Sequence, residues 1–363
     1  MSNQRLLLLQ THSGLHTGQP QNPDRLSRDP ENGRPTLRPA SILGALRKQI
    51  RDQLYSNYQA EPDWKQAAGQ DAGLTSLFGT KGESEGALSA KAGELLLLPV
   101  RSLHGVFAWV CSPGVLASLA QQLATLDLDP LPELPALHPF DALCHEKNVC
   151  LLEAQHLLLE ELSFQRKGDL QGLLKWLTQS GLLGGHEVAD RLADRLVLIS
   201  DTAFDHFMRY AMLPMVRTET RTEARGENGQ ERFQRLQHVE MLPPNTWLYS
   251  LLDLDESQNW ADHAGRLPAF VYIGSHRTTG HGLCALSLVS PKSKSESQAE
   301  SQVEVQPEVQ AESQVEVQPE VQSEVQAEGP VETSTESPVE TSTESVTESP
   351  PDSPPDHLPD SSP

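Results

Sequence analysis

The sequence predicts an α+β fold followed by a disordered acidic tail. Over residues 1–290, apolar runs of strand length alternate with stretches of helical periodicity, which is typical of a packed domain. Residues 291–363 contain no Phe, Trp or Tyr and consist of acidic repeats. Such a segment lacks the apolar groups that would offset the entropy of ordering its backbone, so we predict that it is disordered.

The charge is divided unevenly between these two parts. The chain of 363 residues has a net charge of −22, and the tail contributes 17 acidic and 2 basic residues, a net of −15. The body therefore carries −7. A charge of −22 would argue against nucleic-acid binding, whereas a body near −7 with clustered arginines does not.

Cysteine usage and hydropathy restrict the class of protein further. The four cysteines form no CxxC pair, so neither a zinc site nor a disulfide framework is predicted. The first apolar run, residues 6–9, is too short for a signal peptide, and no later run approaches the length of a membrane span. The sequence therefore predicts a soluble cytoplasmic protein with reduced thiols and no membrane partner.

The predicted elements alternate along the chain. We expect a strand at 5–11, a loop, a helix to about residue 55, strands at 95–101 and 105–110, and a helix beginning at Ser112. A Leu-rich insertion at about 127–195 has a helical stretch near 170–177. A strand at 196–199, a helix capped by Ser200, and strands near 246–252, 269–273 and 283–289 follow. This order is expected of a ferredoxin-like or RRM-type antiparallel sheet with helices on one face and insertions.

A loop rich in proline and acids precedes the first helix. Four prolines between residues 23 and 39 disfavour helix there, and Leu43, Leu46, Ile50 and Leu54 then recur at helical spacing. We expect Ser41 to cap this helix. Its outer face carries Arg47, Lys48 and Arg51, which is either a solvated surface or a phosphate-binding one.

Two later segments are candidates for nucleic-acid contact. The loop at 274–282 has three glycines between two strands, and its amides, with Arg277 and two histidines, can hold phosphate, although an ordinary tight hairpin explains the glycines equally well. At about 216–240, Arg and Glu alternate with Thr, which indicates a projecting hairpin with a turn at 226–229, or alternatively a charged helix.

Several motifs in this order resemble one family. The segments are His12-Ser-Gly14, Asp24 to Asp29, the run from Gly33 to Arg47, residues 78–113, SDTAFDHFMRYA with EMLPPNTWLYSLL, and YIGSHRTTGHGLC. Together they resemble the RAMP superfamily of CRISPR effector subunits, and within it the RNase backbone subunit of the type III-B (Cmr) complex. The resemblance spans nearly all of residues 5–290.

The resemblance implies roles for individual residues. Asp24 matches the carboxylate required for target-RNA cutting and is the implied ligand of a divalent Mg²⁺ or Mn²⁺ ion, with Asp29 as the fallback. His12 and Glu240 match positions near the cut site, although each also has a structural interpretation. The hairpin at about 216–240 resembles the family's thumb. The implied RNA-binding residues are Ser41, Arg47, Lys48, Arg51, Arg101, Arg217, Arg221, Arg225, Gly274, His276, Arg277, Thr278, Gly280 and Gly282.

The implied function is antiviral defence by a ribonucleoprotein. The subunit would bind guide crRNA, form a helical filament with copies of itself and with other Cmr subunits, and cleave complementary target RNA at regular intervals. The implied metal-dependent endoribonuclease reaction leaves cyclic phosphate and 5′-hydroxyl ends. We further hypothesise that the acidic tail limits non-specific RNA binding, so that deleting residues 291–363 raises RNA affinity at low salt.

Two alternatives remain open at this point. The segment after Asp24 is one residue shorter than the family pattern, and Leu43 stands where the family commonly has Lys. These departures favour a catalytically silent crRNA-binding scaffold. A guide-processing endoribonuclease that uses His12 and His16 as metal-independent acid and base is the third hypothesis.

Overall fold

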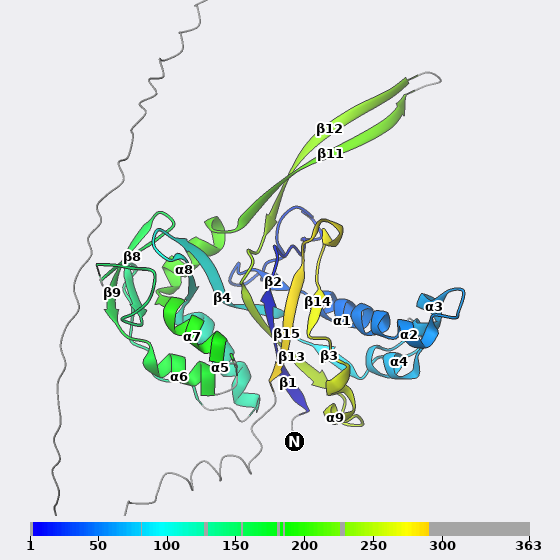
Figure 1. Cartoon of the computed structure of the whole chain (residues 1–363), viewed down its shortest axis with the longest axis horizontal. Coiled ribbons are helices and arrows are strands. Elements are labelled where there is room, and N and C mark those ends of the chain that lie inside the picture. The colour runs from blue at the N-terminus through cyan, green and yellow to red at the C-terminus, as the bar shows by residue number, and fades with distance from the viewer. Residues whose placement is uncertain are drawn as a thin grey trace, which may run out of the picture. The chain divides into compact units, whose positions relative to one another are not determined.

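The structure is a computed structural model that describes residues 3–80, 82–126, 130–153, 155–179, 182–183, 186–225 and 229–289. Along the middle of the hairpin predicted at about 216–240 it describes the backbone alone. The predicted tail, 291–363, lies outside the described residues. The described part is a mixture of helices and strands, which confirms the α+β prediction (Figure 1).

The centre of the sheet is antiparallel. Strand β1 (Gln4–Thr11) pairs with β13 (Trp247–Leu254) on one side and β15 (Leu283–Val289) on the other, and β13 pairs in turn with β4 (Gly93–Ser102). The four leucines of β1 are at most 1% exposed, so this strand is buried on both faces. Short strands complete this half: β14 (Phe270–Tyr272) beside β15, β2 (Thr36–Leu37) beside β4, and β3 (Leu88–Ala90) beside β13.

Strand β4 continues into a second half of the sheet. Its later residues pair with β5 (Val106–Cys111), which lies parallel to β10 (Leu196–Ile199). The remaining strands all come from the predicted insertion at 127–195, and they are β6 (Asp141–Cys144), β7 (Leu151–Leu152), β8 (His156–Leu159) and β9 (Leu162–Gly168). Because β6 pairs directly with β10, the insertion extends the sheet. Its strands were not predicted.

The first helix agrees with the sequence-based prediction except at its cap. Helix α1 (Pro39–Gln53) buries Ile42, Leu46 and Ile50. The prediction that Ser41 caps it is wrong, because Arg38 occupies the cap position without a side-chain bond and Pro39 opens the helix. Proline suits this position, since the amide that it lacks would have no helical partner. Three short helices follow, α2 (Tyr55–Tyr58), α3 (Trp64–Gly69) and α4 (Ala72–Phe78).

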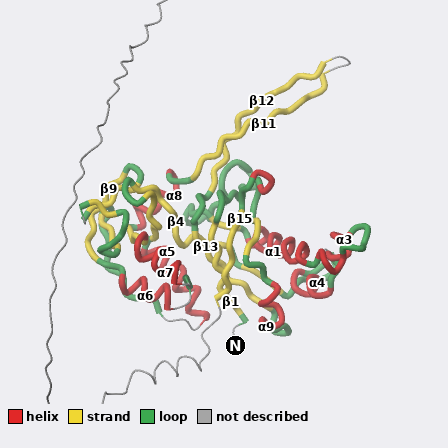
Figure 2. The backbone as a smooth tube through the Cα atoms, viewed as in Figure 1, coloured by secondary structure: helices red, strands yellow, loops and turns green. Residues whose placement is uncertain are grey.

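The predicted serine caps of the later helices are confirmed. The Ser112 hydroxyl accepts a hydrogen bond from the Val115 amide at the start of α5 (Pro113–Leu123), and Ser200 accepts one from Ala203 in α8 (Asp201–Tyr210). Helix α6 (Gln171–Gln179) covers the predicted helical stretch. Helices α7 (His186–Arg195) and α9 (Trp260–His263) complete the described α-helices. Two short 3₁₀ turns lie at Ala124–Leu126 and Ala264–Arg266. Figure 2 shows α5–α7 and α1–α4 on opposite sides of β1 and β13.

The charged ribbon is a long hairpin. Strands β11 (Leu213–Arg225) and β12 (Gly229–Met241) pair antiparallel along their whole length, from Leu213 opposite Met241 to Arg225 opposite Gly229. This confirms the predicted hairpin and excludes the alternative of a charged helix. The hairpin projects from the body (Figure 1). Most of its predicted turn, residues 226–228, lies outside the described residues.

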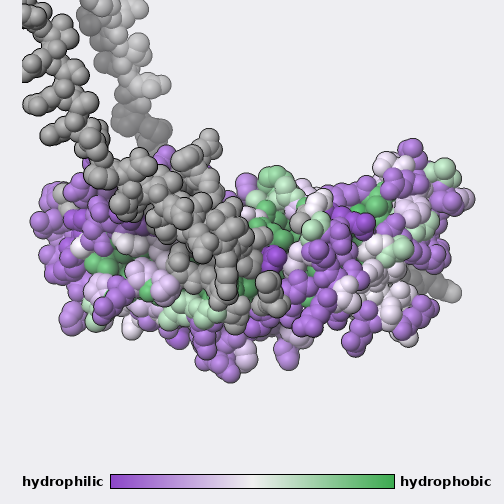
Figure 3. Space-filling view, turned by 90° about the horizontal axis from the view of Figure 1, so that it is seen from below, coloured by the Kyte–Doolittle hydropathy of each residue, from purple (hydrophilic) through white to green (hydrophobic). Residues whose placement is uncertain are grey.

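The surface opposite the hairpin is mostly hydrophilic. Figure 3 views the molecule from that side, and where grey atoms do not cover it the hydrophobic patches are small and separated. The large apolar side chains instead form one core beneath both halves of the sheet. Among the described helices, none is both long enough and apolar enough to cross a membrane.

Candidate RNA interface and cleavage site

Several loops meet at the C-terminal end of β1. The β11–β12 hairpin projects from this same end of the sheet (Figure 1). Leu15, shortly after β1, and Leu242, which follows β12, exchange main-chain hydrogen bonds of 2.9 and 2.8 Å. The Gly282 amide donates to the Gly14 carbonyl oxygen at 2.9 Å. These bonds fix the loop after β1 to both the base of the hairpin and the glycine-rich loop at 274–282.

The glycine-rich loop needs its glycines. Gly274 and Gly282 have φ angles of +79° and +85°, and a Cβ on Gly274 would lie 2.0 Å from the His16 carbonyl oxygen. That oxygen instead accepts the Ser275 amide at 3.0 Å. A single 3₁₀ turn, Arg277–Thr279, forms the tip. The structure thus places six predicted RNA-binding residues on one short loop: Gly274, His276, Arg277, Thr278, Gly280 and Gly282.

His16 lies at the junction of these segments. It is only 2% exposed, and its Nδ1 lies 2.6 Å from the Glu240 carbonyl oxygen while Nε2 lies 2.7 Å from that of Pro23. Its own carbonyl oxygen accepts the Ser275 amide. Because both ring nitrogens face main-chain oxygens inside the protein, this ring is not available to exchange protons with a substrate.

Glu240 holds the loop that carries Asp24. Its Oε1 is 2.5 Å from the Arg28 guanidinium, its Oε2 accepts the Leu26 amide at 3.2 Å, and its own amide donates to the Asp24 carbonyl oxygen at 2.9 Å. Arg28 also donates to the Met208 carbonyl oxygen. Both carboxylate oxygens of Glu240 are therefore occupied in fixing this loop.

The Asp24 side chain is left without such contacts. It is half-buried, and within the described ranges its carboxylate has no hydrogen-bond or ion-pair partner. The fallback residue, Asp29, differs because its Oδ1 accepts the amides of Glu31 and Asn32 at 2.9 and 3.1 Å. Asp29 thus stabilises a local turn, whereas Asp24 keeps a free carboxylate on a fixed loop.

His12 lies at the same end of the sheet but on another side. It is exposed, and its ring packs edge-on against Phe270 of β14 with 5.6 Å between centroids. Its amide donates to the Leu283 carbonyl oxygen at 2.8 Å. Among the contacts of the described residues, none joins His12 to Asp24.

A cavity of about 230 Å³ opens between the Asp24 loop, the end of α8 and the base of the hairpin. The sequence analysis singled out only one of the residues that line it, Glu240. The others are Arg25, Arg209, Tyr210, Met212, Pro214, His238 and Val239. No motif joins them, because they come from segments that are far apart in the sequence. The one available signal was the pair Arg209-Tyr210, polar and aromatic, at a predicted helix end.

The other predicted RNA contacts lie on separate elements. On α1, Lys48 and Arg51 are 3.4 and 2.8 Å from Asp52. Partial burial opposes ionisation of Asp52, yet these two cations lower its pKa below the ordinary value. Arg101 is 75% exposed at the end of β4, 3.6 Å from Glu160 in the second half of the sheet. The structure therefore does not bring Arg101 onto the α1 surface.

The predicted thumb arginines follow one another along β11. The pairing places Arg217 opposite Gln237, Arg221 opposite Phe233 and Arg225 opposite Gly229. They are thus spread along β11, from Arg217 beside the cavity at the base of the hairpin to Arg225 at its far end.

A family model described as the RAMP superfamily matches residues 8–285. The chain belongs to the RAMP superfamily. The match begins within β1 and ends within β15, and so includes all of the loops described above. The family resemblance predicted from the motifs is confirmed.

The similar proteins include Cmr4 proteins and a chain of a Cmr complex. The CRISPR system Cmr endoribonuclease Cmr4 of Pyrococcus furiosus is 25% identical over 297 residues, which cover 77% of this chain and 92% of the relative. The crystal structure of oligomeric Cmr4 from Pyrococcus furiosus has a TM-score of 0.58 at 23% identity, covering 80% of this chain and all of that one. A chain of the type III-B Cmr-beta complex bound to cognate target RNA gives 0.55 at 17% identity, covering 79% and 97%. The chain is therefore Cmr4-like over most of its length.

The RAMP site contains one candidate metal ligand. Among the described residues no three His, Cys, Asp or Glu side chains gather into a group that could hold a metal ion. Mg²⁺ commonly binds through one or two carboxylates, with water and substrate phosphates completing its shell. The free Asp24 carboxylate fits a site of that kind, which substrate RNA would complete, and does not fit an all-protein cage.

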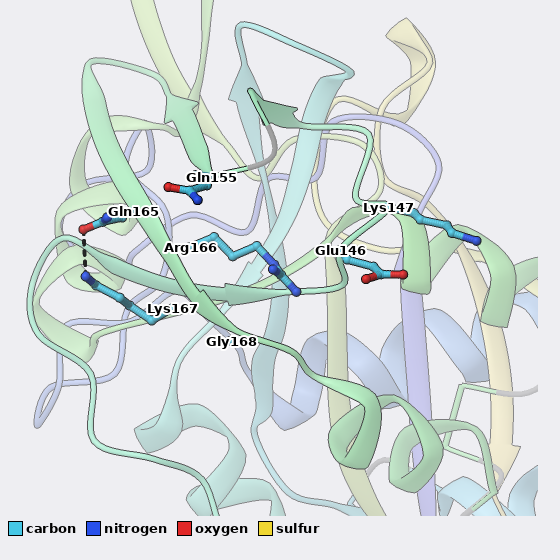
Figure 4. A pocket seen from close by; sticks show the side chains of 7 residues that line it. All are labelled: Glu146, Lys147, Gln155, Gln165, Arg166, Lys167 and Gly168. Atoms are coloured by element: carbon cyan, nitrogen blue, oxygen red, sulfur yellow. Dashed lines mark hydrogen bonds between the residues drawn. The ribbon is translucent and has the colours of Figure 1, made fainter.

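A larger cavity, of about 680 Å³, lies elsewhere in the RAMP fold (Figure 4). It is formed by β8, β9 and the turn after β6, and its lining is Glu146, Lys147, Gln155, Gln165, Arg166, Lys167 and Gly168. Figure 4 shows the Arg166 side chain extending toward the segment that carries Glu146. None of these residues was predicted to be functional.

Proposed function

We propose that this chain is a backbone subunit of a type III-B CRISPR effector, which binds guide crRNA and cleaves complementary target RNA at regular intervals in antiviral defence. The observation that carries the proposal is the Asp24 carboxylate, which is free of partners among the described residues on a loop fixed by Glu240, Arg28 and His16. The similarity to an endoribonuclease named Cmr4 over most of both chains supports it.

We assign the proposed RNA contacts to the surface around the Asp24 loop. We assign the guide backbone to the amides and cations of the glycine-rich loop and to the basic face of α1. We assign the duplex to the β11–β12 hairpin acting as the thumb. Contacts to phosphate make affinity depend on salt and leave sequence to base pairing. We also interpret the order β15-β1-β13-β4, antiparallel throughout, as the ferredoxin-like core.

The chemistry begins at a ribose. Asp24 accepts the proton of a target 2′-hydroxyl, the 2′-oxygen attacks the adjacent phosphorus, and the bond to the 5′-oxygen breaks. The products are a 2′,3′-cyclic phosphate and a 5′-hydroxyl. A Mg²⁺ or Mn²⁺ ion held by Asp24 and substrate oxygens would stabilise charge on the phosphate. Glu240 positions the loop, and His12, which is exposed at the same end of the sheet, is the auxiliary proton donor that we assign to the leaving oxygen.

The proposed partners are crRNA, target RNA, further copies of this chain and other Cmr subunits. Two of the structural relatives are an oligomeric Cmr4 and a Cmr complex bound to target RNA, which supports this set. Guide processing by His12 and His16 is disfavoured, because the buried His16 ring contacts main-chain oxygens through both nitrogens. A silent scaffold remains the second candidate, since within the described residues no other acid or base contacts the Asp24 carboxylate.

Target cleavage tests the proposal. The complex is reconstituted with guide RNA and a labelled target in manganese, with Asp24→Ala beside wild type and Asp29→Asn as the matched control. General acid–base groups contribute about 10²–10⁴-fold, so we expect evenly spaced cuts that fall by at least about 10²-fold in Asp24→Ala and persist in Asp29→Asn. Guide binding should survive in both variants. An intact target with wild type, while the duplex stays bound, would establish the silent scaffold instead.

A further inference from the structure

The cavity at the base of the hairpin combines features of a nucleotide site. Its volume of about 230 Å³ is below the range of about 300–1,000 Å³ that holds drug-sized ligands, which suits a single base. Its walls come from three separate segments: Arg25 of the loop after β1, the end of α8, and the base of β11 and β12. A ligand there would contact all three segments.

One wall is an exposed aromatic ring. Tyr210, the last residue of α8, is 70% exposed, although large aromatic side chains are usually well buried. Its ring lies 4.8 Å from that of His206, one turn earlier, and His206 pairs with Glu161. This hydrogen bond lowers the pKa of the Glu161 carboxyl. Tyr210 is therefore supported from within the protein while most of its surface stays free for stacking.

The other walls carry two arginines, and the one carboxylate among the lining residues, that of Glu240, is paired with Arg28 instead. Arg25, Arg209 and His238 are all exposed at the cavity, and in the part of the chain that the structure describes neither arginine forms an ion pair. The neighbouring Arg28 and Arg34 differ, because Arg28 pairs with Glu240 and Arg34 with two aspartates of α8. Guanidinium groups left free beside an aromatic ring are suited to the phosphate and base of one nucleotide.

The position of the cavity indicates which RNA strand supplies the nucleotide. Arg25 directly follows Asp24, and Glu240, which lines the cavity, donates its amide to the Asp24 carbonyl oxygen at 2.9 Å. We propose that this cavity receives one unstacked nucleotide of the target strand, with its base on Tyr210 and its phosphate between Arg25 and Arg209. The assignment to the target strand rests on the proposed function, whereas the site itself rests on the geometry.

Photocrosslinking tests both which RNA strand occupies the cavity and whether its base contacts Tyr210. The full reconstituted complex carries Asp24→Ala so that the target stays intact, and 4-thiouridine is placed in turn at each target position and then at each guide position. We expect crosslinks to the peptide containing Tyr210 from periodically spaced target nucleotides. Crosslinks from the guide alone, or none to this peptide, would overturn the proposal.

Affinity measurements supply the second test. Stacking on an aromatic side chain contributes about 1–3 kcal/mol per base, so Tyr210→Ala should weaken target binding by roughly tenfold. Tyr210→Phe keeps the ring and should stay within about twofold of wild type. The control is Tyr55→Ala, because Tyr55 is also exposed, at 48%, but lies on α2. With an abasic residue at the crosslinked position, Tyr210→Ala should cause no further loss.

The outcomes separate this inference from the proposed function. If wild type leaves the target intact but crosslinking and affinity still depend on Tyr210, the nucleotide site stands and the nuclease proposal falls. If wild type cleaves the target while Tyr210→Ala binds it with full affinity, the nuclease proposal stands and the nucleotide site falls.

Discussion

The two cavities differ in how their charged groups are paired. In the larger one, the Arg166 guanidinium lies 3.5 Å from Asp169 and donates to the Cys144 carbonyl oxygen, and the Lys167 ammonium donates to Gln165 at 2.7 Å. In the smaller one at the hairpin base, Arg25 and Arg209 form no ion pair with any described residue. Two of the three cations that line the larger cavity, Arg166 and Lys167, therefore have partners within the protein.

This difference bears on which of the two cavities is suited to a phosphate. A phosphate entering the larger cavity would compete with Asp169 for Arg166, whereas at the hairpin base it would meet cations that already face solvent. The free carboxylate of Asp24 also adjoins only the smaller cavity. Unpaired charge on fixed segments therefore favours the smaller cavity as an RNA site, whereas volume alone would favour the larger one.

Removing the carboxylate of Glu240 at the smaller cavity should have the largest effect. Glu240→Ala leaves Arg28 unpaired and releases the Leu26 amide, and because the Glu240 side chain is only 12% exposed we expect a loss of about 2 kcal/mol in the free energy of unfolding. Misplacement of Asp24 should lower the rate of target cleavage by about tenfold or more. Denaturant unfolding and single-turnover cleavage measure the two effects.

Asp169→Ala is the matched change at the larger cavity. The Asp169 side chain is 31% exposed and its ion pair with Arg166 is longer, so we expect at most about 1 kcal/mol of destabilisation and unchanged cleavage. If Asp169→Ala slowed cleavage as much as Glu240→Ala, the distinction between the two cavities would fail.

The free cations should give the next largest effect. Arg25→Gln combined with Arg209→Gln removes two phosphate contacts, so we expect about tenfold weaker target binding at low salt and a salt dependence that is shallower by about 1.4 in log–log slope. Lys147→Gln combined with Lys167→Gln is the control at the larger cavity and should leave both quantities unchanged. Filter binding across a salt series measures them.

The smallest expected effect concerns the buried thiol of Cys144, whose carbonyl oxygen accepts a hydrogen bond from Arg166 of the larger cavity. Burial raises the pKa of Cys144 to about 12, so at pH 8 only roughly 10⁻⁴ of this thiol is ionised in the folded protein. We expect no alkylation by iodoacetamide at pH 8 until denaturant is added. Because the unfolded thiol ionises near pH 8.5, this group should also lower the free energy of unfolding as the pH rises above that value. Rapid alkylation of native protein would show that the β6–β9 region opens.

Much of the fold followed from local sequence signals. Ser112 and Ser200 predicted helix starts correctly, because a hydroxyl before an apolar stripe satisfies the first amides. Ser41 misled, since Pro39 can open a helix without a side-chain cap. Strands β6–β9 escaped prediction because runs such as HLLL at His156–Leu159 are too short to distinguish strand from helix by period.

The candidate site was predictable only in part. The family motifs located Asp24, Glu240 and the glycine-rich loop, and the structure places all three at one end of the sheet. Arg25, Arg209 and Tyr210 follow no motif, because chain topology alone brings them together. Arg101 shows the converse, since the sequence analysis grouped it with the other RNA-binding residues, yet it lies in the other half of the sheet beside Glu160.

The contacts of His16 can form only after most of the domain has been synthesised. Its partners are at Pro23, Glu240 and Ser275, so the support of the Asp24 loop spans more than two hundred residues of sequence. A ribosome releases Asp24 early and the last of these partners near the end of the domain. An unfinished chain that lacks Glu240 and Ser275 therefore exposes Asp24 on a loop without most of the contacts that fix it in the complete domain.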